Sequence, residues 1–355
     1  MTCRKCEHGI CKRFGFFGKR RIQRWRCNSC NSTFCEPHTK LTRDTMLAKH
    51  DAAVRAIQCL VEGCSIRSTE RLTGLNRNTI MRLLILAGTR SARLMDERMR
   101  ELHSRYLQVD EIWTFVQKKA RRIRSGDSPE IGDQWIFVAI DAETKLIPSF
   151  RIGKRSRQDT TEFLWDLYRR LADRVQLTTD GLVHYTRMVP ECFGLDVDFA
   201  QVVKLFGEWG QSDANARYSP SPIVEVISKV RSGDPDPDHI STSYVERQNL
   251  TMRMQLRRLT RLTNAFSKKL SHLKAAVALH FAYYNFCRVH SSLRITPAME
   301  AGIADHIWTL QRTVKSAQHI IPSPNIGPYA FIDYSVIVRV SHAKCGAAAT
   351  YETTL

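Results

Sequence analysis

The spacing of hydrophobic residues predicts a chain in which helices precede and follow a block of strands. Over residues 48–100 apolar side chains recur at helical intervals. From Tyr106 the pattern changes to short runs rich in β-branched and aromatic residues, YLQVDEIWTFV, QWIFVAID, LIPSFRIG and VQLTTD, with a helical stretch over 161–172. Turn-rich sequence fills 210–222, and long helical segments follow Tyr244. These alternations predict a mixed α/β domain preceded by a helical one.

Composition and net charge indicate a folded protein that binds a polyanion. The 355 residues are 43% hydrophobic and 25% charged, which excludes a disordered chain. Lys and Arg number 54 against 35 Asp and Glu, so the net charge of +19 favours a polyanion such as nucleic acid or an anionic membrane. No apolar run approaches the roughly 20 residues that span a bilayer, and no signal-peptide core follows the start MTCRKCEHGI. We therefore expect a cytoplasmic protein.

The cysteines predict a metal site at the N-terminus. Six of the eleven fall within the first 35 residues, a density that favours metal binding over disulfides. Cys3-x-x-Cys6 and Cys27-x-x-Cys30 are matching knuckles, and each presents two thiolates to one tetrahedral ion. They predict a zinc ribbon over 1–44 that unfolds without its structural zinc. Other residues able to replace a ligand are Cys11, Cys35, His8 and His38.

Residues 66–86 (IRSTERLTGLNRNTIMRLLIL) have the layout of a helix-turn-helix. The turn falls at Gly74, and Asn76 is a suitable cap for the second helix. An ordinary helical hairpin fits this segment equally well, but the basic charge of the chain favours a DNA-binding domain over 45–100. The residues predicted to reach DNA are Arg77, Asn78 and Arg82.

Three acidic residues have the order expected of a metal-dependent nuclease core. Asp110 lies within the strand YLQVDEIW, Asp180 ends the strand VQLTTD, and Glu246 opens the helix SYVERQNLTMR. Each alone has an ordinary explanation, such as a turn residue or a helix-dipole partner. Converging carboxylates are nevertheless what a pair of Mg²⁺ ions requires. Their order along the chain predicts a ribonuclease H-like core.

The zinc knuckles, the helix-turn-helix, QVDEIW, TTDG and above all YVERQNLTMR with AVALHFAYYNFCRVHSSLRITPAMEAG resemble bacterial transposases of the insertion sequence one family. This family belongs to the aspartate-aspartate-glutamate class. The resemblance covers about 1–315 and implies a ribonuclease H-like catalytic domain over 104–315, whereas 316–355 match nothing. It implies that the catalytic residues and Mg²⁺ ligands are Asp110, Asp180 and Glu246.

The same resemblance implies the cofactors and partners. Two Mg²⁺ ions, with Mn²⁺ as an alternative, would support strand cleavage and strand transfer. The partner would be double-stranded DNA, at the element ends and at the target, bound by a homo-oligomer associated with the bacterial nucleoid. Two other functions remain open from the sequence: a non-catalytic DNA-binding regulator, and a plain metal-dependent nuclease or resolvase. No Gly-rich phosphate loop is present, so ATP is not implied.

Neighbouring acidic and polar residues offer alternatives within the site. Glu111 adjoins Asp110, but consecutive strand residues point to opposite faces, so we expect Glu111 not to share the metal. Asp141, at the end of the next strand, is the first alternative ligand. Three residues that follow Glu246 on the predicted helix are expected to orient it or to contact the DNA backbone, namely Asn249, Arg253 and Arg257. Three polar residues are expected to fix the late helix to the turn that follows it, namely Asn285, Arg288 and His290.

Overall fold

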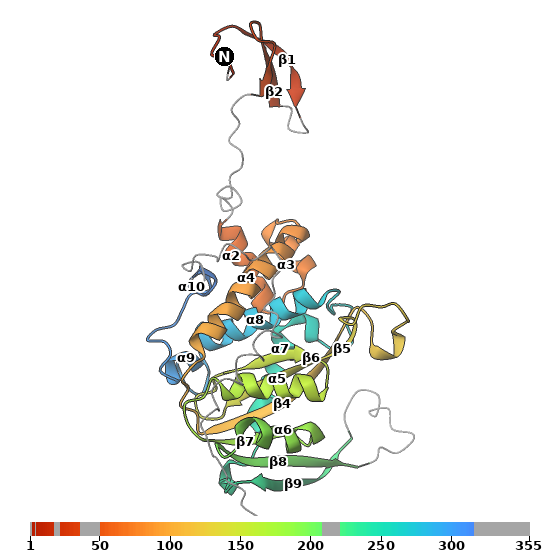
Figure 1. Cartoon of the computed structure of the whole chain (residues 1–355), viewed down its shortest axis with the longest axis vertical. Coiled ribbons are helices and arrows are strands. Elements are labelled where there is room, and N and C mark those ends of the chain that lie inside the picture. Colours follow the sequence, from red (N-terminus) through yellow and green to blue (C-terminus); the bar gives the residue numbers. More distant parts are fainter. Residues whose placement is uncertain (1, 4, 18–21, 36–49, 208–220, 316–355) are drawn as a thin grey trace, which may run out of the picture.

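The N-terminal part of the chain is a small antiparallel sheet. The computed structural model describes residues 2–3, 5–17, 22–35, 50–207 and 221–315. The first three strands pair in the order β1 (Cys11–Phe17), β2 (Ile22–Cys27) and β3 (Thr33–Cys35) (Figure 1). The expected boundary between residues 44 and 45 and the segment 316–355 lie outside the described residues.

The larger part is built on a six-stranded mixed sheet with the order β6-β5-β4-β7-β8-β9. Its strands are β4 (Tyr106–Val116), β5 (Gly132–Asp141), β6 (Phe150–Gly153), β7 (Val175–Thr179), β8 (Val197–Phe206) and β9 (Ile223–Ser232). β4, β5 and β6 are antiparallel neighbours, β7 and β8 run parallel to β4, and β9 is antiparallel to β8. This mixed sheet is consistent with the ribonuclease H-like arrangement that the sequence predicts.

Helices cover both faces of the sheet (Figure 1). They are α2 (His50–Val61), α3 (Ile66–Thr73), α4 (Arg77–Arg98), α5 (Arg157–Tyr168), α6 (Val183–Phe193), α7 (Ser243–Gln255), α8 (Leu270–Phe286), α9 (Pro297–Glu300) and α10 (Leu310–Lys315). Because side chains alternate along a strand, Leu107 and Val109 of β4 pack with α5 and α6, whereas Ile112 and Val116 pack with α4, α7 and α8. Among the described helices, none is long and apolar enough to cross a membrane.

Helices α3 and α4 are joined by a tight turn. Gly74 ends α3 in the left-handed region at φ 67°, and Asn76 caps α4 by accepting a hydrogen bond from the Asn78 N–H at 2.9 Å. Arg77, Asn78 and Arg82 are exposed on α4. The geometry thus presents these three side chains to solvent on one helix.

The second half of α4 belongs to the core of the sheet domain. Ile80 packs with Ala56 of α2, whereas Leu84 and Leu94 join the cluster that contains α8 and the sheet. At Gly88 the two helices meet so closely that a Cβ would lie 2.2 Å from the Ala275 carbonyl oxygen of α8. Helices α2 and α4 therefore share a hydrophobic core with the sheet.

Gly88→Ala is expected to lower the free energy of unfolding by about 3 kcal/mol, because the added methyl group meets rigid backbone and forces α4 away from α8. Urea unfolding of the purified chain measures the change. Thr89→Ala, at the exposed neighbouring position of α4, is the control and should change the free energy by less than about 0.5 kcal/mol. An unaltered unfolding curve for Gly88→Ala would contradict the close approach of the two helices.

The late helix α8 is fixed to the sheet differently from the sequence prediction. Asn285 was expected to bind the turn after α8, but it is buried and clamps the backbone of Ile147. Its Oδ1 accepts from the Ile147 N–H at 3.0 Å, and its Nδ2 donates to the Ile147 carbonyl at 2.9 Å. The reason is that residue 285 faces the segment between β5 and β6 rather than the turn after α8. His290 does fix that turn, through its backbone N–H to the Ile295 carbonyl at 2.9 Å.

Candidate functional site

Two predicted acidic residues lie side by side where two parallel strands diverge. The pairing of β4 with β7 ends at Val109 and Thr179, so Asp180 follows β7 directly beside Asp110. Carboxylate oxygens of Asp110, Glu111 and Asp180 lie within 4.8 Å of one another. We call these three residues the acidic cluster.

We expected Glu111 to be unable to share a metal with Asp110, but its carboxylate lies within 4.8 Å of those of Asp110 and Asp180. β4 continues to Val116 after its pairing with β7 has ended, so among the described strands none pairs with this edge beside Glu111. The Glu111 carboxylate is buried at the edge, where it accepts a hydrogen bond from the hydroxyl of Tyr185 on α6. Side chains still alternate between the two faces along β4. Beside the unpaired edge, however, the carboxylates of Asp110 and Glu111 can reach the same position from opposite faces.

A single arginine bridges two members of the acidic cluster. The guanidinium of Arg155, in the loop between β6 and α5, lies 3.1 Å from Glu111 Oε2 and 3.5 Å from Asp180 Oδ2. The same guanidinium lies over the ring of Trp135, 4.5 Å from its centroid. Arg155 therefore offsets part of the negative charge of the cluster and holds Asp180 beside Glu111.

The carboxylates of the acidic cluster resist ionising together. Burial, and next the charge of Asp180, raises the pKa of Asp110 to about 6 and the pKa of Glu111 to about 8. Burial also raises the pKa of Asp180. A divalent cation would relieve this repulsion, and carboxylate oxygens are its preferred ligands. The residues present thus fit a Mg²⁺ site.

Helix α7 is anchored to β4 next to the acidic cluster. Gln108, two residues before Asp110 on the same face of β4, is buried and accepts hydrogen bonds from the free N–H groups of Tyr244 at 2.8 Å and Val245 at 3.2 Å. Asn249, one turn further along α7, donates to Asp110 Oδ2 at 2.8 Å. These contacts fix the first turns of α7 over Asp110.

Glu246 lies near the acidic cluster but outside the group that meets within 4.8 Å. Its carboxylate pairs with Lys204 of β8 and accepts from the Thr242 hydroxyl at 2.6 Å. Its charge nevertheless contributes to the raised pKa values of Asp110 and Asp180. The structure therefore places Glu246 beside the other two predicted residues, with its carboxylate held by a lysine.

The remaining predicted residues fall into different places. Asn249 orients Asp110 rather than Glu246. Arg253 is half-buried, and its pKa is lowered first by burial and then by the charge of Arg261. Arg257 is exposed in a short 3₁₀ turn after α7. Of these three, Asn249 is in direct contact with the acidic cluster.

Asp141, the first alternative ligand, is a turn residue. It pairs with Leu107 at the other end of β4, three positions from the Val138–Asp110 pair. Its Oδ1 accepts from the N–H groups of Glu143 at 2.8 Å and Thr144 at 3.1 Å, which fixes the turn after β5. Asp141 is thereby removed from the acidic cluster.

Increasing pH is expected to destabilise the chain when no Mg²⁺ is added. A carboxyl group with a raised pKa keeps its proton in the folded state at pH values where the unfolded chain has already lost it. The free energy of unfolding therefore falls as pH rises from the pKa of the group in the unfolded chain to its pKa in the folded chain. For Asp110 and Glu111 this window runs from about 4 to about 8. Thermal unfolding at several pH values measures the effect, and Asp110→Asn should flatten the curve and raise the unfolding temperature at pH 7. Equal pH dependence in Asp110→Asn and the unaltered chain would contradict this origin.

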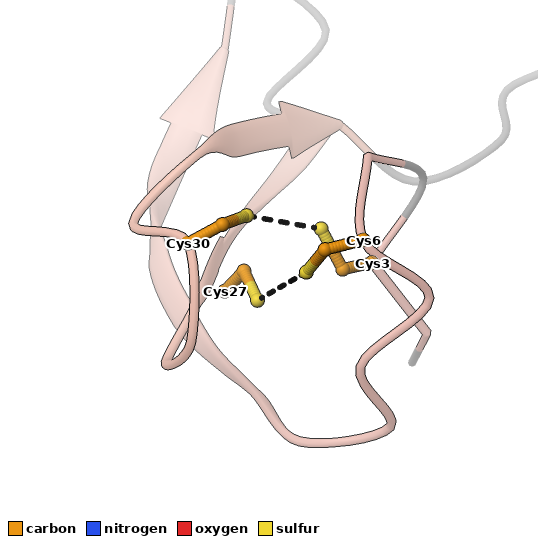
Figure 2. Close-up of side chains that lie close together, drawn as sticks. All are labelled: Cys3, Cys6, Cys27 and Cys30. Carbon is orange, nitrogen blue, oxygen red and sulfur yellow. Dashed lines mark hydrogen bonds between the residues drawn. The ribbon is translucent and has the colours of Figure 1, made fainter.

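The four predicted zinc ligands converge in the N-terminal sheet. Figure 2 shows their sulfur atoms facing one another, with Cys3 Sγ 3.6 Å from Cys30 Sγ and Cys6 Sγ 3.6 Å from Cys27 Sγ. All four sulfurs lie within 4.8 Å of one another. A tetrahedral zinc with bonds of about 2.3 Å separates its sulfurs by about 3.8 Å, so the cluster fits one zinc ion.

The two knuckles have matching hydrogen bonds. The Lys5 N–H donates to Cys3 Sγ, and the Ser29 N–H donates to Cys27 Sγ, both at 3.4 Å. The residues after the second cysteines, Glu7 and Asn31, both adopt left-handed backbone with φ 56° and 54°. Two such turns, each with an N–H group aimed at a sulfur, stabilise thiolates and support metal binding.

Comparisons with known proteins give distant matches. No protein-family model matches the chain, and no curated protein matches it. Among solved structures, the chain is similar to the Mos1 transposase paired-end complex with the left transposon end, at 12% identity and a TM-score of 0.20, over 40% of this chain and 56% of that one. The Mos1 strand transfer complex matches at 15% identity and a TM-score of 0.20, again over 40% and 56%. A piggyBac transposase synaptic complex with hairpin DNA matches at 10% identity and a TM-score of 0.27, over 79% and 59%. The matches thus cover less than two thirds of each of these chains.

Proposed function

We propose that this protein is a DNA transposase that cleaves DNA strands and transfers them, with Asp110, Asp180 and Glu246 as its catalytic carboxylates. One observation carries the proposal. Asp110 and Asp180 come together where the pairing of the parallel strands β4 and β7 ends, with raised pKa values and with Glu246 on the adjoining helix. The charge of +19 favours DNA as the polyanionic substrate.

The residues of the site have separate tasks in this proposal. Asp110, Asp180 and Glu246 would hold divalent metal, which activates a water molecule or a 3′ hydroxyl for in-line attack on a phosphodiester. Asn249 orients the Asp110 carboxylate through its 2.8 Å hydrogen bond. Arg155 positions Asp180, and Lys204 holds the Glu246 carboxylate that would join Asp110 and Asp180 in holding the metal.

The finer assignment follows from the sequence resemblance. We infer that the chain is an insertion-sequence transposase of the insertion sequence one family and that it acts as a homo-oligomer on the element ends. Residues 1–44 would form a zinc ribbon and 45–100 a helix-turn-helix domain. The cysteine cluster and the exposed residues of α4 support these two assignments.

Incubation of the full chain with supercoiled plasmid and Mg²⁺ tests the proposed function. Nicked circles and linear DNA are expected, together with joined products when a duplex with a free 3′ hydroxyl is supplied. Cleavage without joining would favour the plain nuclease. Binding without cleavage would favour the non-catalytic regulator and would contradict the transposase.

Sequence-selective DNA binding should depend on the exposed face of α4. Arg77, Asn78 and Arg82 are replaced together by Ala. The ratio of affinities for element-end and random duplexes is expected to fall about ten-fold or more for each lost base contact. Competition gel shifts with element-end and random duplexes measure the preference. Arg93→Ala, on the exposed part of the same helix but paired with Glu97, is the control. An unchanged preference for element-end DNA in the triple variant would show that these α4 residues do not recognise the DNA sequence.

A further inference from the structure

Four aromatic side chains form a row that leads away from the acidic cluster. Trp113 and Phe115 lie on the same face of β4, with ring centroids 5.7 Å apart, and Trp135 is opposite Trp113 on β5. Phe266, in the segment before α8, contacts Phe115 with a centroid distance of 4.6 Å. All four are partly exposed. We call these four residues the aromatic strip.

Cations lie along the whole aromatic strip. The Lys119 ammonium is 5.5 Å from the Trp113 centroid and 5.9 Å from the Phe115 centroid, and Lys268 is 3.2 Å from the Phe266 centroid. Within the part of the chain that the structure describes, no carboxylate pairs with Lys119 or Lys268. At the other end Arg155 lies over Trp135 and contacts the acidic cluster. The strip therefore starts at the proposed catalytic site.

A cavity of about 300 Å³ lies at the far end of the aromatic strip. Phe115 and Phe266 supply aromatic wall, and the basic residues that line it include Lys119, Arg121 and Arg122. Of the described residues that line the cavity, none is acidic. Its volume is at the lower end of the roughly 300–1,000 Å³ of small-molecule sites, and a flat group the size of a nucleobase fits such a space.

The loop that carries these cations is held in place. Lys118 binds both carboxylate oxygens of Asp127 at 2.7 Å, and Asp127 also accepts from the Arg124 N–H at 2.7 Å. Asp133 of β5 accepts from the Ala120 N–H at 2.8 Å. Asp127 and Asp133 thus hold the backbone of this loop in place, and the loop carries the basic side chains that line the cavity.

We propose that the aromatic strip binds an unpaired DNA segment next to the cleavage site. In a duplex the faces of the bases are covered by their neighbours, so exposed aromatic rings can stack only on unpaired bases, while the flanking cations bind phosphates. From Glu111 to Phe115 β4 rises about 13 Å, the length of roughly four stacked nucleotides at about 3.4 Å each. The proposal rests on the proposed function, since the strip is assigned to the same DNA substrate.

Binding measurements without Mg²⁺ separate this proposal from the catalytic one. Fluorescence anisotropy with the full chain compares a labelled oligothymidylate of about 15 nucleotides with a blunt duplex of the same length. Trp113→Leu combined with Phe115→Leu should weaken binding of the oligothymidylate about ten-fold or more and binding of the duplex less than about two-fold. Trp165→Leu, which removes a half-exposed tryptophan of α5 that also lies beneath an arginine, is the matched control.

A second variant keeps the test valid if the first unfolds. Lys119→Ala combined with Arg121→Ala changes two exposed side chains and should lower the slope of log affinity against log salt by about 1.4 for the oligothymidylate. The control removes the same charge at two exposed positions elsewhere, Arg105→Ala with Lys229→Ala.

Three results would overturn the aromatic strip as a site for unpaired DNA. They are unchanged oligothymidylate binding in both strip variants, equal loss for both probes in the aromatic variant, and equal loss in the controls. A chain that binds oligothymidylate through the strip but never cleaves plasmid would instead refute the proposed function alone. Cleavage with unaltered binding in the strip variants would refute the strip alone.

Discussion

Asp180→Asn is expected to reduce Mg²⁺-dependent cleavage and strand transfer by about 10³-fold or more, because it removes a negative metal ligand while it nearly preserves shape. Asp110→Asn and Glu246→Gln should have effects of similar size. The measurement is the yield of cleaved and joined products on labelled DNA. Cleavage and joining should fall together, since in the proposed function both depend on the same carboxylates.

Two controls accompany these variants. Asp173→Asn makes the same chemical change at an exposed residue that pairs with His103, and it should leave cleavage unaltered. DNA affinity reports folding, and it should persist or rise slightly in the three site variants, because each loses a negative charge that would face the phosphates of bound DNA. Near-normal cleavage by Asp180→Asn would show that Asp180 is not a metal ligand.

Cys27→Ser is expected to abolish zinc binding and to unfold the N-terminal sheet. A structural zinc supplies about 10–16 kcal/mol to domains of this kind, and the cluster has one sulfur from each of four cysteines. Elemental analysis should find one zinc per unaltered chain and none in the variant, and limited proteolysis should cut the variant within the N-terminal sheet while it spares the six-stranded sheet.

The cysteines outside the cluster provide the matched control. Cys11 and Cys35 lie on β1 and β3, in the same small sheet, and are not among the four convergent sulfurs. Cys11→Ser with Cys35→Ser should keep a full equivalent of zinc. Less than half an equivalent in the unaltered chain, or undiminished zinc in Cys27→Ser, would contradict the zinc site.

The sequence predicted those strands and helices that are marked by their own residues, such as runs of β-branched and aromatic side chains. The strand YLQVDEIWTFV is β4 and QWIFVAID lies within β5, because long runs of β-branched and aromatic residues have one favourable environment, a buried sheet. The predicted helix over 161–172 is present as α5 (Arg157–Tyr168), which starts earlier because Ser156 caps it by accepting from the Asp159 N–H. The strand LIPSFRIG contributes only its second half to β6.

Other elements lacked a recognisable local signal. α6 carries Pro190 within its length, a residue that argues against a helix in a sequence pattern. β9 alternates exposed apolar and charged residues, with Val224, Val226 and Val230 open to solvent, so no buried face marks it as a strand. Both elements form because β8 and the neighbouring helices provide tertiary partners, which a sequence window does not contain.

The sequence indicated individual acidic residues of the candidate site. It did not indicate the contacts that join them to one another and to their partners. Asp110 and Asp180 were found from strand position and order, whereas Glu111 was dismissed because the open edge of β4 depends on where β7 ends. Gln108 and Arg155 act through contacts with α7 and the acidic cluster, 136 and 44 residues apart in sequence, and nothing in their local sequence marks them. Only the folded sheet brings these residues together.

The proposed catalytic site predicts where a divalent metal binds. Crystals of the full chain soaked in Mn²⁺ and measured at the manganese absorption edge would show where the ion binds. The account predicts anomalous density between the carboxylates of Asp110 and Asp180, with Glu246 released from Lys204 to join them, and no such density in Asp180→Asn. Mn²⁺ bound elsewhere, while the acidic cluster keeps its pair with Arg155 and Glu246 keeps its pair with Lys204, would contradict a metal-dependent catalytic site beside the end of β7.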